Sequence, residues 1–295
     1  MKTQVLKTLI TAFLKFLFVI LFAGFIIYEI IFICRLYFFV SCVIPSDSMQ
    51  PTLLKEDYVY VTQRIPGRRV LEYDTMNSQK IIATRKKGKR GIQHNDVLLF
   101  NSPHGEKWGI ITLDISSHFI KRCIALPGDT FYIDNGIYRI ENSVDSFGYY
   151  PYQLQLSNMV DSQFTKIIYN CFPHDNEFSW NIKNFGPLYV PKQGDRISID
   201  AKTVKLYKGI IEYETGKTIS IRNDSALFNN SFTNEYVFAK NYYFMVGDYL
   251  FDSSDSRYWG LLPEDHIIGK VSFIWKSKDP FTDKYRFVRF FKKVL

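Results

Sequence analysis

The sequence predicts a mainly β protein that is tethered to a membrane by one N-terminal helix. The apolar run 16–34 carries one charged residue, and after it the chain alternates short strand-like segments with turn residues. Aromatic residues make up 17% of the chain, and aromatic side chains favour strands. Beyond the apolar run we find no sustained period of 3.6, so we expect strands rather than helices there.

The apolar run 16–34 has about the 20 residues that a membrane-spanning helix needs. Lys2, Lys7 and Lys15 precede it, and no acidic residue does. The positive-inside rule therefore places the N-terminus in the cytoplasm and the chain after Arg35 outside. A cleaved signal peptide has a shorter apolar region, about 7–15 residues, that ends in small residues. This run is longer and continues into Arg35, so we predict an uncleaved anchor.

Several segments beyond the anchor have the composition of strands, rich in β-branched and aromatic residues and bounded by turn residues. They are 58–65, 96–101, 130–142, 240–248 and 269–275. The segment 130–142 predicts a hairpin around Asp134-Asn135-Gly136, because Asn-Gly favours the tightest hairpin turn. Region 143–239 is less regular, and we expect either an inserted β subdomain or a set of long loops.

The chain divides accordingly into five parts. They are a cytoplasmic N-terminus (1–15), the anchor (16–34), the first part of a β domain (35–142), the insert (143–239), and the second part of the β domain with a C-terminal tail (240–295). The basic run 85–90 predicts a solvated loop. For the tail segment 286–295, contact with the membrane and packing as a terminal strand or helix both remain open.

Composition excludes some classes of function. A net charge of +8 fits nucleic acid, an anionic membrane surface or simple solubility. The sequence has neither zinc-finger spacing nor an RNA-binding signature, so we expect no nucleic-acid partner. The four cysteines, 34, 42, 123 and 171, form no CxxC pair, which argues against a metal or redox motif. We favour free, packed cysteines over a disulfide.

The segment "IPSDSMQPTL", 44–53, follows the anchor closely and holds Ser46 and Ser48 between two prolines. A serine hydroxyl is a weak nucleophile until a base takes its proton. The usual base is histidine, but none of the five histidines, His94, His104, His118, His174 and His266, lies in a recognisable triad motif. His118 comes closest. Taken alone, "PSDS" is also ordinary turn material.

A lysine that has lost its proton is the alternative base. Its reference pKa is about 10.4, and complete burial can lower that value by about 3–5 units. The segment "HFIKRCIALPGD", 118–129, surrounds Lys121 with apolar residues. Alternation along a strand places Lys121 and Cys123 on one face and Ile120 and Arg122 on the other. A single strand lysine is usually a surface residue, so this hypothesis gains weight only beside 44–53.

Four pieces in one order give the chain a specific resemblance: the anchor, 44–53, "FIKRCIALPGD" at 119–129 and "GDYLFDSSDSRYWGLLPED" at 247–265. The chain resembles the bacterial type I signal peptidases, also called leader peptidases. That resemblance implies an anchor followed by an extracytoplasmic β-sheet catalytic domain. It also implies a single-pass serine endopeptidase of the bacterial cytoplasmic (inner) membrane. Such an enzyme removes leader peptides after a small-x-small motif through an acyl-enzyme.

The resemblance also implies roles for individual residues. Ser48 is expected to be the nucleophile and Lys121 the general base. The oxyanion hole is expected to consist of the Ser48 backbone N–H and the Ser46 hydroxyl. Ser253 would orient the lysine, and an Asp255–Arg257 ion pair would support the site. Apolar side chains would line shallow pockets for small substrate residues: Ile44, Met49, Leu53, Phe119 and Ile120.

The expected partners are preprotein signal peptides and membrane lipid, with a position close to the secretion translocon, and no cofactor or metal is implied. The sequence departs from the family pattern at Tyr249-Leu250-Phe251, where Asn-Arg and a polar residue are usual, and at Asp47, where a small residue is usual. Two alternatives therefore stay open. One is a Ser-Lys peptidase with a narrower set of substrates, and the other is a tethered binding domain without activity.

Overall fold

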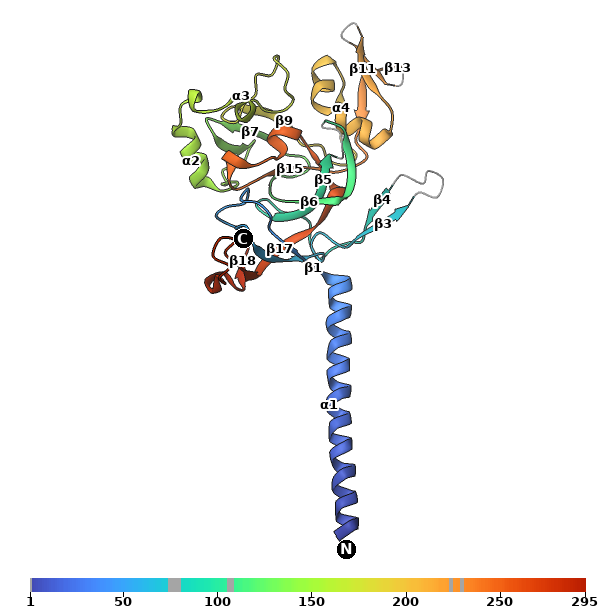
Figure 1. Ribbon diagram of the computed structural model, residues 1–295. Coiled ribbons are helices and arrows are strands. Elements are labelled where there is room, and N and C mark those ends of the chain that lie inside the picture. Colours follow the sequence, from blue (N-terminus) through green and yellow to red (C-terminus); the bar gives the residue numbers. More distant parts are fainter. Residues whose placement is uncertain (1, 74–80, 105–108, 223–224, 229–230) are drawn as a thin grey trace. The chain divides into compact units, whose positions relative to one another are not determined.

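The structure, a computed structural model, describes residues 2–73, 81–104, 109–222, 225–228 and 231–295. The chain forms two compact units, Met1–Val40 and Ser41–Leu295. Figure 1 shows both, with labels on α1 and on many of the helices and strands of the second unit. The functional residues predicted from the sequence all belong to the second unit, so its sheet decides how they meet.

The first unit is formed almost entirely by helix α1 (Lys2–Phe38). Within it, Leu9–Ile33 has a mean hydropathy of 2.7 and is long and apolar enough to cross a membrane. This stretch of 25 residues begins before the predicted run 16–34, because apolar residues already dominate from Leu9 onward. Length and composition thus agree with a membrane-anchored protein.

The second unit is organised by one large sheet of eight strands. Along the main path the order is β1 (Phe39–Val43), β2 (Asp57–Thr62), β17 (Ile267–Ser277), β5 (Val97–His104), β6 (Ile111–Ala125), β15 (Tyr242–Val246) and β16 (Leu262–Pro263), and β18 (Lys292–Lys293) pairs with β17. The pairs from β2 to β16 are antiparallel. The predicted strands at 58–65, 96–101, 240–248 and 269–275 are confirmed, with shifted ends.

The predicted hairpin at 130–142 is confirmed. Strands β7 (Thr130–Asp134) and β8 (Ile137–Ile140) pair in antiparallel register, with Asp134 opposite Ile137. The two-residue loop has Asn135 at φ 45° and Gly136 at φ 83°, both left-handed. A hairpin turn with two positive φ angles matches the twist of the strands, which explains the Asn-Gly sequence. Strand β9 (Phe185–Tyr189) completes this small sheet.

The prediction of a mainly β fold is confirmed, but region 143–239 also contains helices that the missing 3.6 period did not predict. Region 143–239 contains α2 (Tyr150–Asn158) and α4 (Ala201–Thr215). Helix α4 begins at Asp200, whose side chain accepts a hydrogen bond from the Thr203 backbone, and it ends at Gly216 in the left-handed conformation. Its buried residues are Val204, Tyr207, Ile210 and Ile211. This spacing is a helical stripe, but β-branched residues and Gly209 conceal it in the sequence.

The remaining elements are short. They are β3 (Arg69–Tyr73), β4 (Ile81–Arg85), α3 (Lys166–Tyr169), β10 (Arg196–Ser198), β11 (Ile219–Arg222), β12 (Ser225–Phe228), β13 (Ser231–Thr233), β14 (Glu235–Val237) and α5 (Ser256–Trp259). Strand β10 pairs with β14, and β11–β13 form a sheet of three strands beside α4. Region 143–239 therefore mixes helices with small sheets.

One hydrophobic cluster joins region 143–239 to the large sheet. The ring of Phe131 lies 4.3 Å from that of Phe244 on β15, and Phe185 on β9 lies 5.4 Å from Phe244. A second cluster, which includes Phe100, Cys123 and Met245, covers another part of the sheet. Side chains of β15 therefore belong to both clusters. This packing holds the start of the loop that follows β15 in place.

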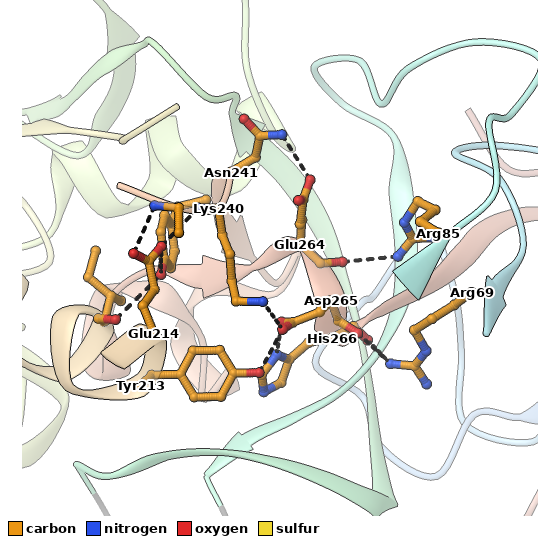
Figure 2. A network of polar contacts seen from close by, with 12 residues as sticks. Arg69, Arg85, Tyr213, Glu214, Lys240, Asn241, Glu264, Asp265 and His266 are labelled. Carbon is orange, nitrogen blue, oxygen red and sulfur yellow. Dashed lines mark hydrogen bonds and ion pairs between the residues drawn. The ribbon is translucent and has the colours of Figure 1, made fainter. Parts of the chain in front are cut away.

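A polar network fixes the β3–β4 ribbon and α4 to the segment before β17 (Figure 2). Arg69 donates to the Asp265 carbonyl at 2.7 Å, and Arg85 donates to the Glu264 carbonyl at 3.0 Å. The Asp265 carboxylate accepts from Tyr213 Oη at 2.8 Å and pairs with Lys240 Nζ at 2.9 Å. These bonds tie the two arginines and helix α4 to the backbone and carboxylate of the segment that leads into β17.

The prediction of a solvated loop at 85–90 was wrong at both of its ends. Arg85 bonds backbone carbonyls in the network above, and Arg90 forms a bidentate pair with Asp96 at 2.8 and 3.0 Å. Lys86, Lys87 and Lys89 between them are exposed, as expected. Arg85 and Arg90, at the two ends of the segment, have structural roles because a guanidinium can donate to several carbonyl or carboxylate oxygens at once.

Part of the C-terminal tail packs against the sheet as a short strand, β18. Strand β18 pairs with β17, with Phe273 opposite Lys293. Arg289 lies against the fully buried Asp57 carboxylate, with Nη2 2.5 Å from Oδ2. The exposed Phe287 side chain lies just before Arg289. The tail thus covers the start of β2 through a buried ion pair.

Candidate active site

The turn 44–53 is anchored at both ends. The Ile44 backbone donates to the Asp57 carbonyl at 2.8 Å, and the Leu53 backbone donates to the Met49 carbonyl at 2.9 Å. The side chains of Ile44, Met49 and Leu53 are 3%, 1% and 0% exposed. These apolar side chains point into the protein and hold the turn, so Ser48 between them has a defined position.

Ser48 and Lys121 meet in this structure. Lys121 Nζ on β6 lies 2.6 Å from Ser48 Oγ, although 73 residues separate them in the chain. Ser48 is 9% exposed and Lys121 5%. The register that sets Lys121 opposite Leu98 on β5 also fixes which face of the sheet the lysine occupies. A buried hydroxyl and amine at this distance can exchange a proton.

Burial lowers the pKa of Lys121 to about 8, because the charged ammonium loses its hydration. The charges of Asp255, Asp252 and Asp248 act in the opposite direction, and that of Arg257 adds to the lowering. Desolvation is the largest of these effects. A substantial fraction of Lys121 is therefore neutral slightly above neutral pH, as a general base requires.

The groups expected to hold an oxyanion lie beside the nucleophile. Ser46 Oγ is 3.4 Å from Ser48 Oγ, and Ser46 is exposed toward solvent. The Ser48 carbonyl accepts a hydrogen bond from the Tyr249 backbone N–H at 3.1 Å. That bond joins the turn to the loop after β15 and limits rotation of the Ser48 peptide unit. Asp47 is half-buried between the two serines.

Ser253 lies within the same site, packed against the backbone of the nucleophile. A Cβ placed on Gly247 would lie 2.2 Å from Ser253 Oγ and 2.5 Å from the Ser48 carbonyl oxygen. Only glycine can occupy that position between Ser48 and Ser253. Ser253 is buried, and its Oγ makes no hydrogen bond within the described part of the chain. Orientation of Lys121 by Ser253 thus stays a prediction.

Asp255 and Arg257 form a fully buried ion pair, each 0% exposed. Arg257 Nε lies 2.8 Å from Asp255 Oδ1, and Nη2 lies 2.8 Å from Oδ2. Asp255 Oδ2 also accepts from the Gly247 backbone at 3.0 Å. Burial opposes both charges, but the pair outweighs it, so the pKa of Asp255 is lowered and that of Arg257 is raised. The pair shapes the loop after β15 around Gly247.

A second buried pair was missed by the sequence analysis. Arg122 Nε lies 2.7 Å from Asp248 Oδ1, and Thr52 Oγ1 donates to Asp248 Oδ2. Arg122 follows Lys121 on β6 and points to the opposite face, as alternation predicts. Through Asp248 this arginine joins the turn 44–53 to the loop after β15. The only signal for this pair in the sequence was the presence of a basic residue, Arg122, in one motif and an acidic residue, Asp248, in another.

The predicted pocket residues differ in exposure. Phe119 and Ile120 on β6 are partly exposed next to Lys121, whereas Ile44, Met49 and Leu53 are buried. Only Phe119 and Ile120 therefore present open surface to a substrate in this structure. The ring of Phe119 packs edge-on against Phe100 at 6.2 Å, which fixes its orientation.

The histidines take other roles. His118 lies three residues before Lys121 on β6, and a separation of three places their side chains on opposite faces of the strand. His94 Nε2 lies 2.7 Å from Asp129 Oδ2, and His174 Nε2 lies 2.9 Å from the Tyr258 carbonyl. His266 is buried against Asp265. Lys121 is thus better placed than these histidines to accept the proton of Ser48.

The cysteines are free where the structure describes their side chains, namely Cys42, Cys123 and Cys171. Burial raises the pKa of the Cys171 thiol to about 12 and raises that of Cys123 well above its usual value. Both thiols are therefore protonated and act as apolar core groups. The expectation of packed, free cysteines is confirmed for these residues.

Comparison with known proteins places this geometry in a family. The family described as signal peptidase, peptidase S26, matches residues 13–168 and 186–276. The chain belongs to this family. The match covers α1, the turn 44–53, β6 and the loop after β15, which together hold Ser48, Lys121 and Asp255. The resemblance found in the motifs is thereby confirmed as membership.

Individual relatives carry the name signal peptidase I. A protein from Buchnera aphidicola subsp. Acyrthosiphon pisum is 31% identical over 257 residues, covering 86% of this chain and 73% of the relative. Proteins from Haemophilus influenzae and Aquifex aeolicus are 24% and 25% identical, covering 90% and 85% of this chain and 72% and 81% of the relatives. The similarity thus extends through most of the β domain.

Proposed function

We propose that this protein is a membrane-anchored serine endopeptidase that removes signal peptides from exported preproteins, with Ser48 as nucleophile and Lys121 as general base. The observation that carries the proposal is the 2.6 Å separation of Lys121 Nζ and Ser48 Oγ, both buried. Membership of the signal peptidase family supports the reaction class. The names of the relatives support the substrate class.

The first half of the reaction forms an acyl-enzyme. Neutral Lys121 takes the proton from Ser48 Oγ as that oxygen bonds to the carbonyl carbon of the residue before the cut. The carbonyl oxygen becomes an oxyanion that accepts hydrogen bonds from the Ser48 N–H and the Ser46 hydroxyl. The C–N bond then breaks, and the Lys121 ammonium gives its proton to the leaving amine.

The second half releases the leader. Lys121, neutral again, takes a proton from water, and the resulting hydroxide attacks the acyl carbon. The bond to Ser48 Oγ breaks, and Lys121 returns its proton to that oxygen. Phe119 and Ile120 offer the open apolar surface for small residues before the cut, which fits a small-x-small leader. An added strand of substrate beside the sheet would align that stretch.

The location follows from the anchor. Leu9–Ile33 would span the bacterial cytoplasmic membrane once, with the lysine-rich N-terminus inside and the β domain on the extracytoplasmic side. The anchor holds the chain at the membrane, in contact with its lipid and near the secretion translocon, where leader peptides emerge. The tether thereby raises the local concentration of enzyme at its substrate.

The test uses the full chain in detergent micelles and a preprotein with a small-x-small leader. We expect Ser48→Ala and Lys121→Ala each to lower the cleavage rate by a factor of at least about 10³, because each removes one half of the proton transfer. Lys87→Ala, in the exposed part of 85–90, is the matched control and should cleave at the wild-type rate.

Folding of each variant is checked by its thermal unfolding. Activity of either dyad variant within about tenfold of wild type would refute the assignment of the nucleophile and the base. No cleavage by the wild-type chain, together with binding of the preprotein, would favour the tethered binding domain instead.

A further inference from the structure

Three aromatic rings gather beside the nucleophile, where the sequence departs from its family. Tyr249 and Phe251 follow β15, and their ring centroids are 5.8 Å apart. Tyr152 on α2 contacts both, at 5.3 Å from Tyr249 and 6.1 Å from Phe251. All three rings are partly exposed. Region 143–239 therefore contributes an aromatic side chain to the edge of the site.

A pocket of about 420 Å³ opens next to these rings. Phe251, Ile168 and Tyr258 supply its apolar lining, and Asp252 and Ser253 lie on its wall. Pockets of this volume are at the lower end of the range that takes small ligands or single side chains. One apolar side chain is thus a suitable occupant, with Asp252 and His174 as the titratable groups in the lining.

The pocket adjoins the catalytic groups through one shared residue. It shares Ser253 with the site, and Ser253 packs against the backbone of Ser48 near Gly247. The Tyr249 backbone is bonded to the Ser48 carbonyl. Phe251 is two residues from both Tyr249 and Ser253, so it lies within about 7 Å of each along the chain.

The direction of the substrate follows from the chemistry. Lys121 must give a proton to the leaving amine, so the residues after the cut begin beside Lys121 Nζ. Phe119 and Ile120 occupy the neighbouring positions on β6 and would face the residues before the cut. The loop that carries Asp252 and Asp255 flanks Lys121 closely enough for their charges to act on it.

We propose that the pocket lined by Phe251, Ile168 and Tyr258 binds an apolar or aromatic side chain from the first three residues after the cleaved bond. This inference rests on the proposed function and adds a specificity site for the mature part of the preprotein. An extended chain of three residues spans about 10 Å, and Ser253, which the pocket shares with the site, lies beside the Ser48 backbone at Gly247. The Asp252 carboxylate in the lining disfavours acidic side chains there.

The test compares peptides that share one leader and differ at each of the first three positions after the cut, with Phe, Leu, Ala or Asp. For the wild-type full chain in micelles we expect kcat/KM to be about tenfold higher for Phe or Leu than for Ala at one of these positions, and lowest for Asp. In Phe251→Ala this preference should fall below about twofold, while cleavage of the Ala peptide stays near wild type.

Two variants sharpen the result. Phe251→Leu keeps an apolar wall and should retain most of the preference, which separates a specific pocket from general damage to the loop. Phe232→Ala, which removes an exposed aromatic side chain from β13, is the matched control and should leave the preference unchanged. Equal cleavage of all peptides by the wild type, or a preference that survives in Phe251→Ala, overturns the inference.

Binding provides a readout that needs no turnover. The Ser48→Ala chain should bind the Phe or Leu peptide about tenfold more tightly than the Ala peptide, measured by fluorescence anisotropy, and adding Phe251→Ala should remove that difference. If the wild-type chain failed to cleave the peptides while this binding difference persisted, the proposed reaction would be refuted and the pocket would stand. Equal binding of the peptides, or a dependence confined to residues before the cut, would refute the pocket assignment.

Discussion

Lys121 Nζ lies 2.6 Å from Ser48 Oγ, and the lysine is buried on a strand whose next residue, Arg122, forms a separate ion pair on the other face. The lysine has aspartates near it, but burial is the largest effect on its pKa. Desolvation thus lowers the pKa of Lys121 more than the nearby cation Arg257 does. The function of Lys121 depends on the packing around β6.

The cleavage rate should rise with pH. Burial sets the pKa of Lys121 at about 8, and only its neutral form can accept the Ser48 proton. We therefore expect kcat/KM to increase about tenfold per pH unit below that value and to level off above it. The measurement is a pH profile with a fluorogenic preprotein peptide.

His118 supplies the matched control for this profile. His118→Gln should leave the rising part of the pH profile and its midpoint unchanged, because His118 lies on the opposite face of β6 from Lys121. If kcat/KM instead rose around the histidine reference pKa of about 6.5, and this rise disappeared in His118→Gln, the base would be a histidine.

Gly247→Ala should damage catalysis through the backbone. The added Cβ would lie 2.2 Å from Ser253 Oγ and 2.5 Å from the Ser48 carbonyl oxygen, so the turn or the loop must move. Misplacement of a nucleophile by about 1 Å can cost a factor of about 10². We expect kcat to fall by about that factor with KM little changed.

Gly91→Ala is the control, because its Cβ would meet no atom within 4 Å. It should cleave within about twofold of wild type. If Gly247→Ala kept the wild-type kcat, the close packing of Ser48 against Ser253 would not matter for the rate.

Arg257→Met should destabilise the β domain strongly. It leaves the Asp255 carboxylate buried without its partner, which typically costs about 3–5 kcal/mol. Arg196→Met removes an exposed ion pair with Glu235 and should lower the free energy of unfolding far less. Denaturant unfolding of the full-length variants in micelles compares their free energies of unfolding. Similar losses for the two variants would contradict a structural role of the buried pair.

Asp265 should contribute stability that depends on pH. Burial opposes its charge, but His266 and Lys240 outweigh that effect and hold the pKa of Asp265 well below its usual value. A carboxyl with a lowered folded pKa stabilises the protein above the unfolded value of about 3.9, and this contribution is lost as the pH falls below it. Asp265→Asn should therefore be less stable than wild type at neutral pH.

The loss of thermal stability between about pH 5 and pH 3 should also be smaller in Asp265→Asn than in wild type. Glu141→Gln, which changes an exposed carboxylate, is the control and should lose stability with falling pH as wild type does. Parallel pH curves for Asp265→Asn and wild type would show that the network in Figure 2 adds no pH-dependent stability.

Local patterns were sufficient for much of the fold. The β-branched and aromatic composition of 58–65, 96–101 and 269–275 predicted strands that the large sheet contains, and Asn135-Gly136 predicted the turn of the β7–β8 hairpin. Helix α4 was missed because its buried stripe consists of β-branched and tyrosine residues that locally favour strands. Its helical state depends on burial against its neighbours, which a single-sequence pattern does not record.

The sequence by itself determined the apolar anchor, the strand class and the residue types of a Ser-Lys site, because these depend on short-range spacing. Tertiary structure decided which groups meet. Sheet register brought Lys121 to Ser48, and the loop after β15 placed Asp248 against Arg122 and Tyr249 against the Ser48 carbonyl. Contacts between such distant segments arise only when the whole sheet packs, because each pair contributes too little free energy to form alone.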